Sequence, residues 1–205
     1  MKTLLLTGGK GDIASYLKKI LIGYYIVEAP SREKLDVSCC KSVEEYFKDK
    51  KYDVVINLAG TLHSSKILDS DSELWIKDIQ VNLIGTYLVC KEALLKNKKT
   101  KLINISSTAA FNSYNNWSSY CASKSGVLKI SSALYKDGYD VITLCPGAID
   151  TKFRDGLNIN NPNIMTIEEG CEPIILAIKE KYNNGDVIFY RKGFIKKILE
   201  SDCSI

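Results

Sequence analysis

Three side chains in the middle of the chain have the types and spacing needed to transfer a proton. Tyr120 and Lys124 are four positions apart, so on a helix they share a face. A phenol has a reference pKa near 10 and needs a nearby cation to exchange protons around neutrality, which Lys124 can supply. Ser107 ends an apolar run at the edge where doubly wound sheets place their ligands. The three together favour acid–base chemistry, although Tyr and Lys at this spacing also occur in ordinary helices.

Residues 7–14 form a glycine-rich turn, Thr-Gly-Gly-Lys-Gly-Asp-Ile-Ala, between an apolar run and a helical pattern. Glycines let the backbone approach a pyrophosphate closely, and the following helix N-terminus supplies free N–H groups and the positive end of its dipole. The same residues would suit a tight strand-to-helix turn without a ligand. Their position at the first turn of an alternating chain favours phosphate binding.

The elements that must position these residues alternate along the chain. Apolar runs predict strands at residues 4–6, 24–29, 35–37, 54–58, 102–106, 141–145 and 187–190. Helical patterns cover residues 12–21, 42–50, 72–96, 116–136 and 166–181. Strands rich in Val, Ile and Leu without alternation are buried on both faces, and strands alternating with helices form parallel sheets. We therefore expect a single Rossmann-type domain over residues 1–205, with about seven strands in a doubly wound parallel sheet and helices on both faces.

Two local features qualify this expectation. Only residues 30–34 separate the second and third predicted strands, too few for the crossover helix of a parallel pair. Either that helix is absent or residues 35–37 pair only briefly. Ser42 begins the sequence Ser-Val-Glu-Glu, which predicts a capping box at the start of the next helix.

Composition excludes several classes of partner. The 28 basic and 24 acidic residues give a net charge of +4 and are spread along the chain, so we expect no nucleic-acid surface. One histidine and seven cysteines without a CxxC pair predict no metal site and reduced thiols. The first apolar run is too short for a signal peptide, and no stretch is long enough to cross a bilayer. These features predict a cytoplasmic protein with no membrane partner.

Five segments in order make the chain resemble the short-chain dehydrogenase/reductase family over about its first 190 residues. Residues 7–14 resemble that family's TGxxxGxG turn and residues 57–60, Asn-Leu-Ala-Gly, its NNAG strand end. Asn82 falls on the family's helix asparagine. Residues 120–124 match YxxxK, and residues 146–151, Pro-Gly-Ala-Ile-Asp-Thr, resemble PGxxxT.

The resemblance implies a role for each matched residue. Tyr120 would be the general acid that protonates the developing alkoxide, or the base in the reverse direction. Ser107 would bind the substrate carbonyl, Lys124 the nicotinamide ribose, and Asn82 a water in the proton relay. The cofactor contacts that the resemblance implies are Thr7, Gly8, Gly11, Asp12, Ile13, Asn57, Ala59, Gly60, Pro146, Gly147, Ile149 and Thr151.

Departures from the family pattern bear on the cofactor. The family's second and third glycines fall at Asp12 and Ala14, and Gly11 replaces one of them in part. No acidic residue that would bind a ribose 2′-hydroxyl is obvious after the second strand; Ser31 and Arg32 stand there instead. An arginine at this place favours a 2′-phosphate, hence NADP(H) with NAD(H) as the alternative, unless it is a plain surface residue. The pair Asp36 and Val37 resembles the family's adenine-side pair.

The segment 152–165 is expected to cover the substrate. It carries Lys152, Arg154, Asp155, Asn158, Asn160, Asn161 and Asn163. A polar cover suits a small polar substrate, sugar-like or phosphorylated, although an asparagine-rich surface loop needs no ligand. His63, Cys121 and Cys145 lie near the site by sequence and are interpreted as hydrogen-bonding or packing residues.

The remaining expectations concern assembly and rival functions. Members of the family pair through two long helices, here residues 72–96 and 116–136, which implies a homodimer or homotetramer. Residues 194–199 are amphipathic and predict a packed C-terminal arm, or a contact with a membrane or partner. A nucleotide-sugar epimerase or dehydratase would use the same Tyr–Lys pair but usually carries a larger C-terminal substrate domain. A dinucleotide-sensing protein without catalysis would typically lack the tyrosine or the lysine.

Overall fold

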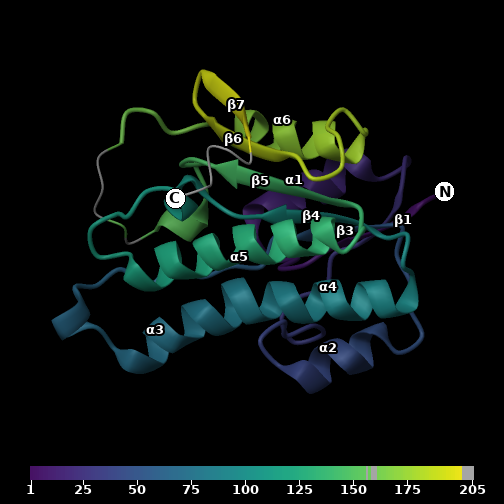
Figure 1. Ribbon diagram of the computed structural model, residues 1–205, viewed down its shortest axis with the longest axis horizontal. Coiled ribbons are helices and arrows are strands. Elements are labelled where there is room, and N and C mark those ends of the chain that lie inside the picture. The colour runs from purple at the N-terminus through teal and green to yellow at the C-terminus, as the bar shows by residue number, and fades with distance from the viewer. Residues whose placement is uncertain (156, 158–160, 200–205) are drawn as a thin grey trace.

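A seven-stranded sheet forms the centre of the protein, in the strand order β2-β1-β3-β4-β5-β6-β7 (Figure 1). The computed structural model describes residues 1–155, 157 and 161–199. The first six strands run parallel and β7 pairs antiparallel with β6. The strands are β1 (Thr3–Leu6), β2 (Ile26–Glu28), β3 (Val54–Asn57), β4 (Lys101–Ile105), β5 (Val141–Pro146), β6 (Val187–Arg191) and β7 (Phe194–Ile198).

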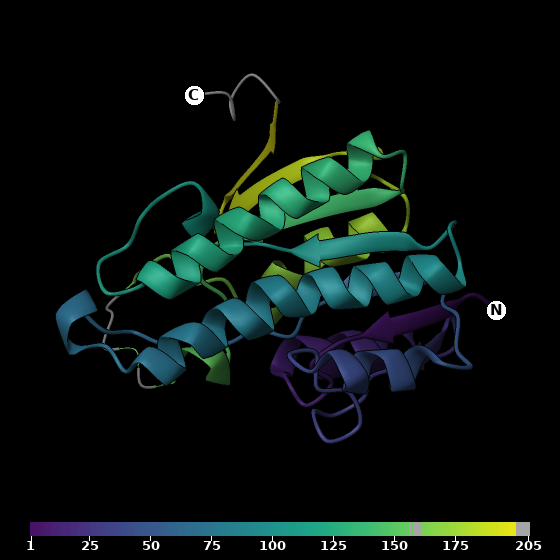
Figure 2. The same cartoon turned by 60° about the horizontal axis from the view of Figure 1, so that its bottom comes forward.

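Helices cover both faces of this sheet, as Figures 1 and 2 show. Helices α1 (Asp12–Leu21) and α6 (Ile167–Ile178) pack together on one face. The other face carries α2 (Cys40–Phe47), α4 (Gly85–Lys96) and α5 (Ser118–Lys136). Helix α3 (Ser72–Asp78) continues the line of α4 through a π-helical segment, Ile79–Ile84. The expected Rossmann-like, doubly wound architecture is thus confirmed, with one antiparallel strand at its edge.

Alternation along β1 explains why both faces must be covered. Leu4 and Leu6 belong to the apolar core beneath α1 and α6, where Leu17 and Ile174 are fully or almost fully buried. Leu5, between them in sequence, belongs to the second core, which α2 and α4 cover. Because successive side chains of a strand point to opposite faces, an apolar run of three needs two layers of helices.

Residues 35–37 do not form the predicted third strand. Strand β2 is the sheet edge and pairs only with β1 among the described residues. Leu35 and Val37 are buried, but they pack in the core with α2 and α4 rather than in the sheet. Their apolar character therefore reflects helix packing, which a run of this length does not distinguish from strand pairing.

The start of helix α2 also differs from the sequence prediction. Helix α2 begins at Cys40 with Cys39 as its N-cap, so the predicted capping box at Ser42 is wrong. The Ser42 Oγ instead accepts a hydrogen bond from the Asp36 N–H at 3.0 Å, which ties the preceding turn to the helix. A capping box does form at α6, where Thr166 and Glu169 exchange side-chain to backbone hydrogen bonds.

The C-terminal arm predicted at residues 194–199 is largely strand β7. The sheet therefore has the expected seven strands, but β7 takes the place of the strand predicted at residues 35–37. The Phe194 ring packs edge-on against Phe189, with the ring centroids 6.2 Å apart. None of the helices in the described part of the chain is long and apolar enough to span a membrane.

Gly9 offers a test of how tightly the first turn is built. A Cβ at this position would lie 2.1 Å from the Ala29 carbonyl oxygen, so the Gly9→Ala variant must push β2 away from the turn. We expect it to lose about 1–3 kcal/mol of unfolding free energy, the usual result of forcing an atom into a packed site. Urea denaturation measures this. The matched control is Gly11→Ala in the same turn, whose Cβ would meet only the Gly8 oxygen at 3.2 Å; equal losses in the two variants would contradict this packing.

Candidate active site

A cleft of about 1100 Å³ opens at the carboxyl ends of the parallel strands. Its volume is slightly above the range of small-molecule pockets, about 300–1,000 Å³. The glycine turn after β1, the loop after β3, the end of β4 with the start of α5, and the loop after β5 line it. The strand order reverses between β1 and β3, and open α/β sheets bind ligands at such switch points.

The structure brings Ser107, Tyr120 and Lys124 together in this cleft, although they come from two elements. Ser107 follows β4, and the other two residues lie on the first turns of α5. All three are less than 10 % exposed, at 7 %, 9 % and 6 %. The Lys124 Nζ donates to the carbonyl oxygen of Ile105 at 2.9 Å and lies 5.6 Å from the centroid of the Tyr120 ring. One ammonium hydrogen is thereby used, which leaves two for a ligand.

Burial shifts the pKa values of the two ionisable groups in opposite directions. It raises the pKa of the Tyr120 phenol from 10.0 to about 12, and the neighbouring Ser107 hydroxyl opposes this rise. It lowers the pKa of the Lys124 ammonium from 10.5 to about 8. Both shifts favour the uncharged form, as expected when a charged form loses its water. At neutral pH the site thus holds a protonated phenol beside a charged ammonium, which is the pairing a general acid requires.

Asn82 lies behind the cleft and does not line it. It is fully buried in the π-helical segment, and its Nδ2 donates to the Thr61 carbonyl oxygen at 2.9 Å and to the Ser123 Oγ at 3.0 Å. Its Oδ1 accepts from the Thr61 N–H at 2.8 Å. A Cβ at Gly60 would lie 3.3 Å from this Oδ1 and 3.9 Å from the Lys124 Nζ. A side chain at position 60 would thus press on the Asn82 amide, whereas its distance to the lysine would be an ordinary contact.

The glycine turn presents backbone to the cleft. Gly8 has φ +68°, a left-handed conformation that suits glycine, and it lines the cleft with Gly11, Asp12 and Ile13. No side chain caps the N-terminus of α1, so its first N–H groups remain for a ligand. The Asp12 carboxylate accepts from the Lys152 N–H at 2.7 Å and thereby ties the segment after β5 to this turn.

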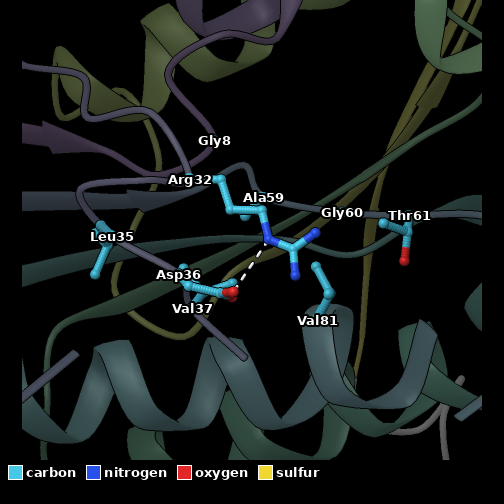
Figure 3. Close-up of a pocket in the computed structure, with 9 residues that line it drawn as sticks. All are labelled: Gly8, Arg32, Leu35, Asp36, Val37, Ala59, Gly60, Thr61 and Val81. Carbon is cyan, nitrogen blue, oxygen red and sulfur yellow. Dashed lines mark hydrogen bonds and ion pairs between the residues drawn. The ribbon is translucent and has the colours of Figure 1, made fainter. Parts of the chain in front are cut away.

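A smaller pocket of about 160 Å³ adjoins the glycine turn, and Figure 3 shows Arg32 extending across it. The Arg32 Nε donates to the Asp36 Oδ2 at 3.0 Å, and Val37, Ala59 and Gly60 complete much of its lining. The Arg32 side chain is 64 % exposed, so this ion pair is well solvated. The guanidinium could therefore exchange its partner for another anion.

Glu28, the acidic residue at the end of β2, lines neither this pocket nor the large cleft, so Asp36 is the acid that this pocket presents. Its Oε2 accepts hydrogen bonds from the Tyr46 and Tyr52 hydroxyls and from the Lys50 Nζ, all within 2.7–2.8 Å. Tyr46 lies in α2, and Lys50 and Tyr52 follow that helix in the chain. Their combined effect lowers the pKa of Glu28 despite an opposing contribution from burial. The carboxylate is thereby held by its own neighbours.

The other predicted cofactor residues divide into two groups. Those that line the large cleft are Arg32, Ala59, Gly60, Pro146, Gly147, Ile149 and Thr151. Thr7, Ser31 and Asn57 line neither pocket. The Thr7 Oγ1 accepts from the N–H groups of Leu58 and Ala59 at 2.9 and 3.0 Å, and the Asn57 Nδ2 donates to the Asn104 Oδ1 at 2.9 Å inside the core. Thr7 therefore links the end of β1 to the loop after β3, and Asn57 links β3 to β4 inside the protein.

Sequence reasoning missed an aromatic wall around Tyr120. The Trp117 and Phe153 rings lie 5.9 and 6.0 Å from the Tyr120 ring, and Tyr114 lies 5.3 Å from Trp117. All of these rings line the cleft. The three-residue spacing of Trp117 and Tyr120 could have identified one member, but Phe153 comes from the loop after β5. Of the segment expected to cover the substrate, Lys152, Arg154 and Asn161 line the cleft, whereas Asn158 and Asn160 lie outside the described residues.

The family model for short chain dehydrogenases matches residues 25–162, more than half of the chain. The chain belongs to the short-chain dehydrogenase/reductase family. An uncharacterised oxidoreductase of Staphylococcus aureus strain USA300 is 30% identical to this short-chain dehydrogenase over 176 residues, covering 82% of this chain and 75% of the relative. Another from strain MRSA252 is 31% identical over 157 residues, covering 71% of this chain and 68% of the relative.

Solved structures of low sequence identity share the fold of this short-chain dehydrogenase. A small-chain dehydrogenase in complex with NADPH has a TM-score of 0.83 at 21% identity, covering 94% of this chain and 98% of that one. An alcohol dehydrogenase from the archaeon Thermococcus sibiricus, complexed with 5-hydroxy-NADP, has a TM-score of 0.78 at 20% identity, covering 97% and 100%. The chain is thus an oxidoreductase of a family that uses a nicotinamide dinucleotide, and its uncapped α1 and open cleft fit such a group.

Burial of Lys124 predicts that this short-chain dehydrogenase gains stability when the charge is removed. A folded pKa of about 8 against 10.5 unfolded means that only the unfolded chain holds the proton between these values. The penalty is therefore full below pH 8, at about 3 kcal/mol, and disappears as pH rises to 10.5. We expect Lys124→Met to be more stable than the wild type at pH 7, with a gain that shrinks by pH 9.5. Urea denaturation at both pH values measures it. Lys129→Met, at an exposed lysine of the same helix, is the control; a gain independent of pH would contradict the burial argument.

Proposed function

We propose that this protein is an NADP(H)-preferring carbonyl reductase or alcohol dehydrogenase that acts on a small polar substrate, sugar-like or phosphorylated. The observation that carries the proposal is the buried Tyr120 hydroxyl, which shares a cleft with Ser107 and the Lys124 ammonium at the switch point of the sheet. The bound cofactor would supply or accept a hydride. The protein's part is to orient the carbonyl and to move one proton.

Each catalytic group has a distinct task in this mechanism. The Ser107 hydroxyl donates to the substrate carbonyl oxygen and holds it near Tyr120. The Tyr120 hydroxyl gives its proton to that oxygen as negative charge develops there, and in the oxidation direction the Tyr120 phenolate accepts the proton of the alcohol. The Lys124 ammonium stabilises the resulting phenolate and binds the cofactor ribose with its two remaining hydrogens. Asn82 acts from behind by holding the loop at Thr61 and, through Ser123, helix α5.

Cofactor preference is proposed from the small pocket. The adenosine ribose would lie there, beside Arg32, with Asp36 and Val37 on the adenine side. Lys10 is a second cation at this end and pairs with Glu33 at 2.9 Å. With Glu28 held by its own neighbours, a 2′-phosphate finds cations and a 2′-hydroxyl finds no free carboxylate at the end of β2. The NADPH and 5-hydroxy-NADP complexes of the structural neighbours are consistent with this preference.

The proposed substrate class follows from what surrounds Tyr120. The Trp117 and Phe153 rings give flat apolar surfaces, while Arg154 and Asn161 add polar groups to the same cleft. Such a mixture suits a compact polyhydroxy compound, whose C–H faces pack on rings and whose hydroxyls or phosphate need donors.

We further propose a single-domain, cytoplasmic homodimer or homotetramer. Exposed apolar side chains along α3 and α4, including Leu74, Ile76 and Tyr87, support assembly through these helices. Buried thiols such as Cys90 and Cys171 are unpaired, as expected in a reducing compartment.

The cofactor assignment is tested with Arg32→Ala. We expect NADPH to bind this variant about 10–100-fold more weakly, since a charge-assisted contact is lost, and NADH binding to change little. Fluorescence titration of both cofactors measures this. Lys34→Ala is the matched control because Lys34 is an exposed cation of the same turn that lines neither pocket. A wild type that prefers NADH, or an Arg32→Ala variant with unchanged NADPH affinity, would sink the NADP(H) assignment.

Tyr120→Phe tests catalysis separately from binding. We expect the variant to bind NADPH as the wild type does and to lose about 10²–10⁴-fold in kcat, because the general acid is gone while the ring still packs against Trp117. NADPH oxidation is followed with glyceraldehyde, erythrose and glyceraldehyde 3-phosphate. A wild type that binds NADPH but reduces no carbonyl favours a sensing protein, and epimerisation of a nucleotide sugar would favour the alternative enzyme class.

A further inference from the structure

A buried carboxylate that the proposed mechanism does not use lies at the end of α3. Asp78 is 1 % exposed and is the last residue of that helix. We propose that Asp78 is a positioning residue of the active site, whose single carboxylate anchors both the loop after β3 and the start of α5 and acts electrostatically on the proton-transfer pair. The kinetic consequences rest on the proposed function, whereas the anchoring does not require any catalytic activity.

The contacts of Asp78 join three segments that are distant in sequence. Its Oδ1 accepts from the Thr61 Oγ1 at 2.7 Å, and its Oδ2 accepts from the His63 N–H at 2.8 Å and the Ser119 Oγ at 2.6 Å. Thr61 follows the glycine that approaches Lys124, and Ser119 directly precedes Tyr120. The carboxylate therefore fixes the distance between the two segments that carry the site.

Asp78 and Asn82 divide this task. Asn82 holds the backbone of Thr61 and reaches α5 through Ser123, one turn of α5 beyond the Asp78 contact. Asp78 holds the side chain of Thr61, the next part of the loop at His63, and the first turn of α5. Because the two residues are four apart on a continuous helical segment, they form two parallel braces between the loop and α5.

Burying a carboxylate at this position costs free energy. No cation forms an ion pair with Asp78 within residues 1–155, 157 and 161–199. A buried charge without a cation depends on hydrogen bonds, whereas an apolar side chain would pack between the helices without that cost. The requirement for a carboxylate thus comes from what its oxygens hold and from its charge.

The charge of Asp78 acts on both members of the proton-transfer pair. It raises the pKa of Lys124, against the effect of burial, and raises the pKa of Tyr120, in addition to burial. Both effects favour the protonated phenol and the charged ammonium that reduction requires. The other ionisable groups around the pair are His63 of the loop, Cys121 of α5, Cys145 of β5 and Arg154 of the segment after β5; of these, Cys121 raises and Arg154 lowers the pKa of Tyr120, and Cys145 raises that of Lys124.

The kinetic test is the pH profile of the Asp78→Asn variant, with the aldehyde of the panel that the wild type reduces fastest. Removing the negative charge lowers both pKa values, so the alkaline limb of kcat for reduction should move to lower pH by about one unit. Ser119→Ala removes one anchor and keeps the charge, so its kcat should fall while the limb stays in place. Asp71→Asn is the matched control, because Asp71 caps the same helix from an exposed position. Asp78→Glu should restore the wild-type limb.

The anchoring is tested without activity, by hydrogen exchange and mass spectrometry. Asp78→Asn should speed exchange in residues 58–65 and 117–121 and leave the core strands unchanged, and Asp71→Asn should not. If Asp78→Asn fails to fold, the Thr61→Val/Ser119→Ala double variant replaces it, with faster exchange in the same segments expected.

Two results would overturn the proposal: an alkaline limb that stays in place in Asp78→Asn, or unchanged exchange in both segments. A wild type that reduces no carbonyl would instead remove the proposed function, and the exchange experiment would still decide the role of Asp78.

Discussion

The burial of the Lys124 ammonium is the constraint on which the site depends. A charge at 6 % exposure needs a fixed acceptor, and the carbonyl oxygen of Ile105 provides one at the end of β4. That contact ties α5 to the sheet at the level where the strands end. It also determines where Tyr120, one turn earlier, presents its hydroxyl. The contact thereby keeps Tyr120, and Trp117 beside it, at the cleft where the strands end.

The same burial explains why the site is surrounded by buried polar groups. Ser107, Asn82, Ser123 and Asp78 are each less than 10 % exposed, and each has hydrogen-bond partners. Satisfied polar groups behind a reactive pair keep its geometry fixed, because leaving any one of them unpaired would be costly. In this region, hydrogen bonds therefore add to the apolar packing around Tyr120 in fixing the side chains.

Much of the fold could be predicted from the sequence because its signals are local. The buried apolar runs gave the central strands, and the glycine turn and Tyr–Lys spacing marked both ends of the cleft. The errors arise where a local pattern serves a different long-range purpose. Leu35 and Val37 are apolar because α2 and α4 cover them, and Ser42 holds the Asp36 backbone instead of capping a helix.

Site residues outside the motifs could not be predicted from the sequence, because long-range contacts bring them to the site. Phe153 joins Tyr120 only because the segment after β5 folds back over the cleft, held by Asp12. In the sequence, Asp78 is one of three acidic residues in the helix predicted over residues 72–96, and nothing local distinguishes it from the other two. Its contacts are with Thr61, 17 positions earlier in the loop after β3, and with Ser119 of α5, 41 positions later. Asn57, which the resemblance assigned to the cofactor, binds Asn104 in the core, because its side chain points away from the cleft.

The adenosine end of the cleft shows how the short connection after β2 affects binding. Residues 31–39 form turns in which Leu35 and Val37 are buried, and they leave Arg32 and Asp36 at the small pocket. An exposed ion pair of this kind is worth about 0–1 kcal/mol, so it gives way readily to a better anion. A phosphate offers the guanidinium a bidentate partner, whereas a ribose hydroxyl does not. The proposed NADP(H) preference therefore depends on the weakness of the Arg32–Asp36 pair as much as on the presence of the arginine.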